Sequence, residues 1–586
     1  MEKTLKQQPI IHRIFPFLVW LKTYQAAFLK GDAIAGLTVA VVLIPQAMAY
    51  AMLAGLPPVY GLYAGAVTPL IGALWGSLRQ LATGPIAIMS LLVLTTLTPI
   101  AEPGSPKFVE LAFLLAFLVG GIYLLIGVFR LGLIMSFISH SAVKGFTSAA
   151  SLIIISTQLP HLFGIQIERH EYMFPKLVAI GQALPGLHWP TLGIGVLALV
   201  IIYGIKKFKP NFPGALVALV VTTLIVYFLK LNESGVTILG KNEGGLPLPA
   251  LLPFDFDMLF ALTGPAVVLA LVSFAETYSV GKSVAAETKQ KLDVDQEFIG
   301  QGVANLVGSF FQCYPVSGSF SRTAINFASG ARTGIASAIT TGTVIITLLF
   351  LTPLLTYIPK AALAALIITA VLMLFHPREV FRLWKMNRHD GIVAICVFTL
   401  SLLSKPDYAL LIGILMSLVF FLWKTMRPRI VRISKDPELN MFVNADMFKK
   451  PGCPQILHLR SDNSIYFANA EYTVESIVER MEEVDTPVKF LLLDLQAMAF
   501  IDITGIEELR VLKEETDAKN MELALMEIHP PVQEVMESSG FMAEMNPELI
   551  LQKRGEAITV LFNHLDHDYC KTVCPYALFF ECRTVK

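Results

Sequence analysis

Apolar stretches fill most of the chain between residues 32 and 425, and they constrain its fold more than any other feature. With 54% hydrophobic and 15% charged residues among 586, the composition excludes an ordinary soluble enzyme and indicates a polytopic, α-helical membrane protein. Several stretches are shorter than the roughly 20 residues that a full helical crossing needs, so hydropathy alone leaves their number open. We place spans near residues 32–55, 58–77, 84–98, 109–129, 138–160, 188–206, 212–230, 258–281, 293–311, 320–332, 335–356, 360–375, 390–404 and 407–425.

Clusters of Lys and Arg predict which span ends face the cytosol. Lys3, Lys6 and Arg13 interrupt the apolar residues of the N-terminus, which reads as cytosolic and without a signal peptide. The basic clusters then all follow even-numbered spans, as the positive-inside rule requires. We therefore expect a multi-pass protein of the inner or plasma membrane with both termini in the cytoplasm, and the zero net charge suggests no nucleic-acid partner. The clusters are Lys206, Lys207 and Lys209; Lys282, Lys289 and Lys291; Arg378, Arg382, Lys385 and Arg388; and Lys424, Arg427, Arg429 and Arg432.

One short stretch, Pro315 to Ala331, interrupts the apolar series with turn-forming residues. A turn at 315–318 precedes Ser319–Arg322 and a brief helical run that ends at Ser329 and Gly330. A helix that starts partway through a membrane presents unpaired backbone N–H groups and the positive end of its dipole. Lipid tolerates these groups only where they line a cavity or meet a ligand, and the natural ligand is an anion. The alternative is a short extramembrane loop rich in Gly and Ser.

A second stretch, Leu81 to Leu91, has the same plan of a short extended run, Gly84 and a half-length apolar helix. Each stretch follows a span rich in small residues. That span follows one with a polar residue in its middle, Gln46 in the first case and Glu276 in the second. Interrupted segments in corresponding positions of two halves are the best sequence indication of a transporter binding site. We therefore expect the two half-helices to face each other at the bilayer midplane.

Four segments carry a family resemblance: GDAIAGLTVAVVLIPQAMAYAMLAGLPPVYGLY at Gly31–Tyr63, ATGP at Ala82–Pro85, GFTSAA at Gly145–Ala150 and NLVGSFFQCYPVSGSFSRTAINFASGARTG at Asn305–Gly334. Through them the chain resembles the SulP sulfate permease family, also called solute carrier family 26, over nearly its whole length. The resemblance implies fourteen spans in two inverted repeats of seven, which form core and gate domains with short strands before two half-helices. It also implies a homodimer and a cytosolic C-terminal STAS domain.

The resemblance assigns residues to a substrate site. In this family the positions of Gln46 and Tyr50, four apart on the first span, help to line the substrate cavity. Ile86 replaces the aromatic residue of vertebrate members, which puts halide-type selectivity in doubt. Ser319 and Ser321 add hydroxyl donors that suit an oxyanion, since each of its oxygens accepts several hydrogen bonds. The expected substrate-binding residues are Gln46, Tyr50, Gly84, Pro85, Ile86, Gly318, Ser319, Phe320, Ser321 and Arg322.

Glu276 and Arg322 are charged residues in an apolar region, where a charge is costly unless it is paired, neutralised or bound to a ligand. Arg322 is expected to hold the anion or to neutralise Glu276. In related members an acidic residue at the position of Glu276 serves cation coupling or the electrostatics of the substrate site. From the sequence, coupling to H⁺, coupling to Na⁺ and a plain salt bridge to Arg322 all stay open.

The composition changes after Trp423, and alternating strand and helix patterns then indicate a small α/β domain. Within it, the turn Asp502–Gly505 lies where STAS domains of anti-sigma-factor antagonists carry a phosphorylatable hydroxyl, and Thr504 falls on that position. Thr504 is thus a candidate regulatory phosphosite, although we prefer the simpler interpretation that it caps the following helix. The expected divisions are an N-terminal segment 1–31, a transmembrane domain 32–426, a linker 427–440, a STAS domain 441–567 and a tail 568–586.

The tail contains Cys570, Cys574 and Cys582, which could bind zinc or another thiophilic metal. Their spacing matches no standard ligand pattern, so reduced cytosolic thiols are the preferred interpretation. We accordingly expect no metal and no cofactor.

The expected function is secondary active transport of an inorganic oxyanion, with sulfate as the first candidate, by an alternating-access, elevator-like mechanism. Bicarbonate and small dicarboxylates are the alternatives within this class. A passive anion channel or a STAS-linked sensor is the alternative from another class, and the carboxylate of Glu276 favours coupled transport instead. No nucleophile–base pair or metal signature is apparent in the membrane region, so an enzyme is not expected.

Overall fold

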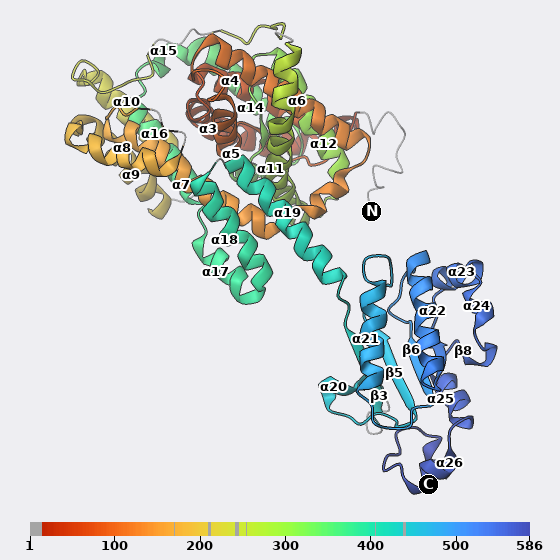
Figure 1. Ribbon diagram of the computed structural model, residues 1–586. Coiled ribbons are helices and arrows are strands. Elements are labelled where there is room, and N and C mark those ends of the chain that lie inside the picture. The colour runs from red at the N-terminus through yellow and green to blue at the C-terminus, as the bar shows by residue number, and fades with distance from the viewer. Residues whose placement is uncertain are drawn as a thin grey trace. The chain divides into compact units, whose positions relative to one another are not determined.

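The computed structural model describes residues 15–585 except 169, 171, 209–211, 241–244, 253–254, 405 and 437–440 (Figure 1). The chain divides into two compact units, one that ends at Ser417 and one that starts at Leu418. Lys209, part of an expected basic cluster, and residues 1–14 of the expected N-terminal segment lie outside the described residues.

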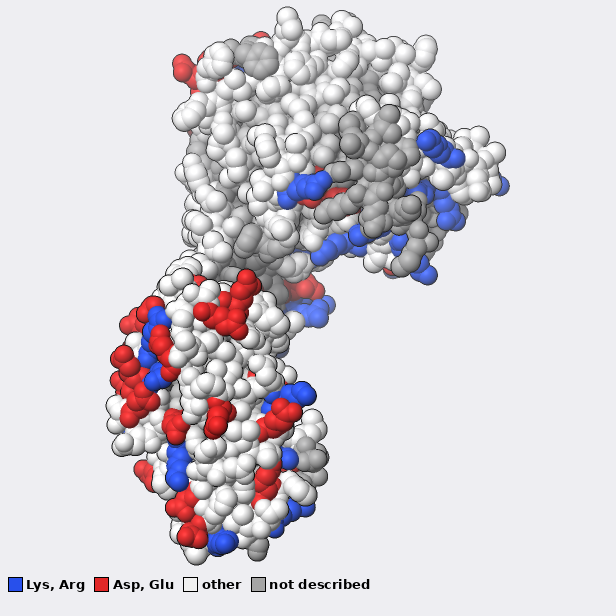
Figure 2. All heavy atoms as spheres, turned by 90° about the vertical axis from the view of Figure 1, so that its right-hand side faces the viewer, with Lys and Arg blue, Asp and Glu red and all other residues white. Residues whose placement is uncertain are grey.

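Each of the expected spans corresponds to a helix in the described part of the chain. Eight helices are long and apolar enough to cross a membrane, whereas α5 and α13 are short. On the face that Figure 2 shows, most of the first unit is uncharged and its Lys and Arg gather in one part, while charged side chains of both signs are spread over the second unit. The span helices are α3 (Ala26–Leu53), α4 (Pro58–Trp75), α5 (Ala87–Leu97), α6 (Pro106–Val128), α7 (His140–Phe163), α9 (Trp189–Phe208), α10 (Gly214–Phe228), α11 (Phe256–Thr288), α12 (Val294–Phe310), α13 (Phe320–Ala328), α14 (Ile335–Ile346), α16 (Lys360–Leu372), α18 (Arg388–Leu403) and α19 (Pro406–Thr425).

Shorter elements connect these helices. After α14 the chain continues through a π-helical turn, Thr347–Leu351, because a proline at position 353 removes a backbone donor from the regular ladder. The remaining elements of this unit are α2 (Phe17–Lys22), η2 (Gly132–Phe137), α8 (Met173–Ala183), η3 (Leu184–Gly186), α15 (Thr352–Leu355) and α17 (Pro377–Met386).

Two short strands bring the half-helices together in the middle of the first unit. Strand β1 (Thr83–Gly84) precedes α5, and strand β2 (Ser317–Gly318) precedes α13. They pair antiparallel, with Thr83 opposite Gly318 and Gly84 opposite Ser317. The N–H of Ser319 also donates to the carbonyl of Ala82 at 2.9 Å. The two interrupted stretches, far apart in sequence, therefore form one structural element.

Side chains of α12 hold the extended segments in place. Asn305 makes two bonds to one residue before β2: its Oδ1 accepts from the N–H of Val316 at 2.9 Å, and its Nδ2 donates to the Val316 carbonyl at 3.0 Å. Gln301 donates to Thr83 Oγ1 at 2.9 Å. Glu297 Oε1 accepts from the N–H groups of residues 77 and 78 at 2.6 and 2.7 Å. Buried backbone groups outside regular structure are thus satisfied by side chains.

Helix α13 and its C-terminal link are held in the same way. Thr323 Oγ1 accepts from the N–H of Ala82 at 2.9 Å, so α13 also bonds to the stretch before α5. Beyond α13, the buried carboxylate of Asp32 on α3 accepts from the N–H groups of Arg332 and Thr333 at 2.6 and 3.0 Å. These contacts fix both half-helices against α3 and α12.

The second unit is built on a six-stranded sheet with the order β4-β3-β5-β6-β7-β8. Strands β5 to β8 are parallel, and β3 is antiparallel to both β4 and β5. The strands are β3 (Ile430–Asp436), β4 (Met441–Asn444), β5 (Ile456–Ser461), β6 (Phe490–Asp494), β7 (Glu522–Met526) and β8 (Ile550–Leu551). The helices are α20 (Ala445–Phe448), α21 (Ala470–Glu482), α22 (Ile503–Ala518), α23 (Pro530–Ser538), α24 (Phe541–Glu544), η5 (Pro547–Leu549), α25 (Arg554–Asn563), α26 (His567–Thr572) and α27 (Cys582–Val585).

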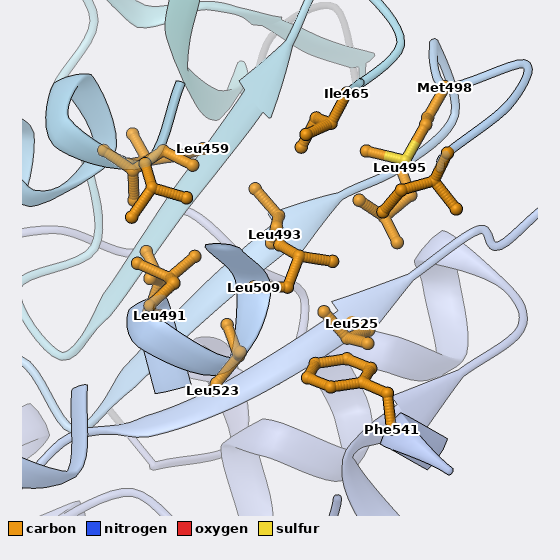
Figure 3. Packing of buried hydrophobic residues seen from close by; sticks show 14 of the residues in the cluster. Leu459, Ile465, Leu491, Leu493, Leu495, Met498, Leu509, Leu523, Leu525 and Phe541 are labelled. Carbon is orange, nitrogen blue, oxygen red and sulfur yellow. The ribbon is translucent and has the colours of Figure 1, made fainter. Parts of the chain in front are cut away.

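Both faces of this sheet are covered, which explains the unbroken apolar run of β6. Alternate residues, such as Leu491 and Leu493, pack with α21 to α24 in the cluster that Figure 3 shows. The intervening Phe490 and Leu492 pack on the other face with α25 and the C-terminal segment. Because side chains alternate across a strand, one apolar run supplies two cores.

The edges of the second unit differ from the expected divisions. Residues 430–436, expected within a linker, are strand β3, whose hydrogen bonds to β5 place it inside the sheet. Residues 437–440 of that linker lie outside the described part. The expected tail is also folded, because Cys570, Leu578 and Phe579 are buried in the second core. The folded tail was not predicted because its sequence is rich in turn-forming residues. Strand β3 was not predicted because charged residues interrupt its apolar pattern.

We predict that Asn305→Leu, which keeps the branched shape of the side chain and removes the amide, destabilises the membrane unit. Leaving the N–H and carbonyl of Val316 without these partners should cost about 1–3 kcal/mol for each buried group. Thermal unfolding of purified protein should show a lower midpoint for Asn305→Leu and an unchanged one for Asn232→Leu, whose side chain is exposed. Equal midpoints for the two variants would show that the hydrogen bonds of Asn305 to Val316 do not stabilise the unit.

Candidate functional site

The starts of α5 and α13 present unpaired backbone donors. Ile86 precedes α5 in extended conformation, and among the described residues no partner accepts from the N–H groups of Ala87, Ile88 and Met89. The same holds for Phe320 and Ser321 at the start of α13. The amides of Gly318 and Ser319 are occupied instead, the former by Thr277 Oγ1 at 3.0 Å. Among the described residues, the amides of Gly318 and Ser319 are therefore occupied, whereas those of the first turns of α5 and α13 are open.

Ser319 caps α13, and its hydroxyl group can still donate a hydrogen bond. Its Oγ accepts from the N–H of Arg322 at 3.4 Å, so its hydroxyl proton stays available to donate. Ser321 Oγ lies 3.5 Å from Ser319 Oγ. Ser319 is buried, Ser321 is half-buried and the ring of Phe320 is exposed. Two hydroxyl groups therefore stand side by side at the open end of the helix.

Arg322 places a positive charge in the site. Its side chain is fully buried and Nη1 donates to the carbonyl of Pro85 at 2.7 Å, so it reaches from α13 to the start of α5. Nε and Nη2 are buried and have no hydrogen-bond partner among the described residues. A Cβ at Gly84, where φ is +152°, would lie 3.1 Å from Nη2, so glycine is needed there. A buried charge with unused donors is costly until a counter-charge meets it.

Glu276 does not supply that counter-charge. Its Oε2 is buried without a partner, and the described side chains of Glu276 and Arg322 form no ion pair within 4.0 Å. The alternative of a plain salt bridge between them is therefore wrong for this conformation. Glu276 lies on α11, which packs against both α5 and α13, so each charge is near the site and unpaired.

Helix α3 supplies the remaining wall. It packs against α5 and α13, and the side chains of Gln46 and Tyr50 are buried on it. Gln46 Oε1 has no partner in the part of the chain that the structure describes. The expected residues thus lie on or next to four helices, of which α3 and α11 each pack against both α5 and α13.

The sequence analysis did not predict the polar groups of α11 that hydrogen-bond to β2. Thr277 Oγ1 lies 2.7 Å from Ser317 Oγ in addition to its bond with Gly318, and Ser317 Oγ donates to the carbonyl of Ser273 at 3.0 Å. The available signal was the pair of hydroxyl residues flanking Glu276 at 273 and 277, one helical turn apart. These residues position the strand, while Glu276 remains unpaired.

Thr504 does not cap α22. Asp502 is the cap, because its Oδ1 accepts from the N–H of Gly505 at 2.8 Å, and Thr504 is exposed in the first turn. The preferred interpretation of Thr504 was wrong since the aspartate two residues earlier competes better for the open amides. Its phosphorylation stays a prediction.

Comparisons with known proteins agree with this architecture. A family model described as the Sulfate permease family matches residues 29–397, and a STAS domain model matches residues 446–557. "Sulfate transporter 4.1, chloroplastic" of Arabidopsis thaliana is 34% identical over 573 residues, covering 95% of this chain and 83% of that protein.

Two solved structures share the fold. The murine Solute Carrier 26 family member A9 anion transporter in its inward-facing state matches with a TM-score of 0.86 at 23% identity, covering 97% of each chain. The transmembrane domain of the cyanobacterial bicarbonate transporter BicA matches with a TM-score of 0.58 at 22% identity, covering 67% of this chain and 98% of that one. The predicted helical membrane fold with a C-terminal STAS domain is thereby confirmed, and the chain belongs to the sulfate permease family.

Proposed function

We propose that this chain moves an inorganic oxyanion, with sulfate as the first candidate, by binding it between the starts of α5 and α13. The observation that carries the proposal is the buried Arg322, whose Nε and Nη2 are unpartnered beside two helix starts with open amides. The guanidinium supplies charge, while the amides and the hydroxyls of Ser319 and Ser321 supply directed donors. This combination suits a small anion with several oxygen acceptors.

The comparisons support the substrate class at two levels. Sulfate transporter 4.1 is 34% identical to this chain, which favours sulfate over other oxyanions. BicA is named as a bicarbonate transporter, which keeps bicarbonate as the second candidate, but that likeness rests on fold alone. Dicarboxylates are the third candidate, since the donors on two helix starts could meet two carboxylate groups.

The proposed mechanism is alternating access, in which the core helices carry the site past the gate helices. The site helices α3, α5, α11 and α13 pack together and are bonded through β1 and β2, so they can move as one body. Uptake of labelled sulfate into proteoliposomes, with bicarbonate and dicarboxylates as competitors, tests the substrate. Accumulation above the equilibrium level under an H⁺ or Na⁺ gradient would separate coupled transport from a passive channel.

We extend the proposal to a homodimer in the inner or plasma membrane with cytoplasmic termini. Thr504 remains a candidate phosphosite, because an exposed hydroxyl in the first turn of α22 would place a phosphate near the positive end of the dipole. A purely monomeric mass in nanodiscs would contradict the dimer, and unmodified Thr504 peptides from native membranes would contradict the phosphosite.

The first prediction concerns Ser321. Ser321→Ala should weaken equilibrium sulfate binding by about tenfold or more, since a hydrogen bond to a charged group contributes roughly 1.5–3 kcal/mol and about 1.4 kcal/mol is one decade. Ser321→Asp should abolish binding through repulsion. Ser329→Ala, at the other end of α13, is the matched control and should bind normally. Normal affinity in folded Ser321→Asp protein would place the site elsewhere.

The second prediction concerns Arg322. Arg322→Gln should lose sulfate binding because it removes the only charge that reaches Pro85 in the described site. Arg332→Gln, ten residues later and exposed, should bind as the unaltered protein does. Titration calorimetry on purified, monodisperse protein measures both. A similar loss in the two variants would indicate a general field effect, and retained binding in Arg322→Gln would remove the proposed role.

The third prediction concerns Glu276. Glu276→Gln keeps the shape and removes the ionisable group, so gradient-driven accumulation should be lost while sulfate exchange continues. Glu287→Gln on the same helix, with an exposed side chain, is the control and should accumulate sulfate. Uptake is measured with imposed H⁺ and Na⁺ gradients in turn. Undiminished accumulation by Glu276→Gln would exclude this residue as the coupling group.

A further inference from the structure

Four of the six cysteines meet in the second unit. Cys453, before β5, lines one small cavity together with Cys570 on α26, Cys574 after it, and Cys582 at the start of α27. The cavity has a volume of about 10 Å³, close to that of a single small occupant. The fold therefore adds a fourth thiol, from far away in the sequence, to the three in the C-terminal segment.

The surroundings leave sulfur as the ligand type. Apolar side chains, including Leu565, Leu578 and Phe579, form much of the remaining wall. The two nearby histidines are engaged elsewhere: His564 Nδ1 pairs with the carbonyl of Val560 at 3.0 Å, and His567 Nε2 with that of Phe562 at 2.9 Å. A site here would accordingly be a set of four thiolates.

We propose that Cys453, Cys570, Cys574 and Cys582 bind one thiophilic d¹⁰ metal ion, with Zn²⁺ as the first choice. Four thiolates in a tetrahedral arrangement are a standard structural zinc site. On binding, four S–H protons pass to solvent, four metal–sulfur bonds form and no electron is transferred. Among the described residues no three ligand side chains already stand at the spacing of a metal site. Binding thus draws α26 and α27 toward the segment that holds Cys453.

The ion would join the segment before β5 to the C-terminal segment of the second unit. Cys453 belongs to the segment that leads into β5, while the other three thiols follow α25. Gln455 already bonds to this region, since its Nε2 donates to the carbonyl of Asp566 at 3.0 Å and to Cys570 Sγ at 3.3 Å. A metal cross-link would strengthen this attachment of the C-terminal segment to the sheet.

The test uses the purified full-length chain, loaded with Zn²⁺ or Co²⁺ and freed of excess metal by gel filtration. We expect one zinc per chain by mass spectrometry of the metal, and the charge-transfer and d–d bands of tetrahedral cobalt tetrathiolate. Cys453→Ser should bind zinc about tenfold or more weakly, because one of four thiolates is lost. Cys396→Ser, on α18 and outside the cavity, is the matched control and should retain both signals.

A second readout covers the fold of the variants. Zinc should protect wild-type protein from trypsin at Lys571 and Arg583, which lie between and after the tail thiols, and should not protect Cys453→Ser. The proposal is overturned if loaded wild-type protein holds no stoichiometric metal, or if Cys453→Ser binds zinc as tightly as wild type. Disulfide bonds among the four cysteines in freshly purified, metal-loaded protein would overturn it as well.

Discussion

Backbone pairing between β1 and β2 is the interaction on which the membrane unit depends. It brings two helix starts together, and it pairs backbone groups of the preceding segments that would otherwise be unpaired in a medium without water. The pairing is supported from α12 and α13, because Asn305 and Thr323 satisfy neighbouring backbone groups and Gln301 donates to the side chain of Thr83. These side chains satisfy part of the buried polar groups near the strands, while the amides at the two helix starts stay open. Open donors from two helices therefore lie close together.

Charge in this unit follows the same logic. Arg322 is buried with two unused donor atoms, and the half-buried Glu276 has one buried, unused acceptor atom, yet the two do not pair among the described residues. An ion pair would have neutralised the site and left nothing to attract an anion. In the proposed mechanism, this separation lets the guanidinium bind an anion and the carboxylate bind a cation. The proposed coupling of the two fluxes would then act through the shared packing of α11 against α5 and α13.

The second unit obtains its stability differently, by covering both faces of one sheet. Alternate residues of β5 to β7 enter two separate apolar clusters, and the C-terminal segment belongs to the second of them. That segment is short and poor in regular structure, so its attachment rests on a few buried residues and on the bonds of Gln455. The four converging thiols lie where an additional cross-link would add most to this attachment.

The membrane character, the helical spans, the two interrupted stretches and the α/β pattern of the C-terminal region could all be predicted from the sequence, because they are local properties of hydropathy and turn chemistry. The sequence also identified Ser319, Ser321 and Arg322 as candidate site residues. Other features depend on contacts that could not be predicted from the sequence. Arg322 bonds to Pro85 and not to Glu276, and Asp502 caps α22. Residues 430–436 form a strand, and Cys453 lies beside the thiols of the tail. A hydrogen bond or a cavity needs two segments at a defined separation in space, and that separation is set by packing of the whole unit and not by the spacing of residues along the chain.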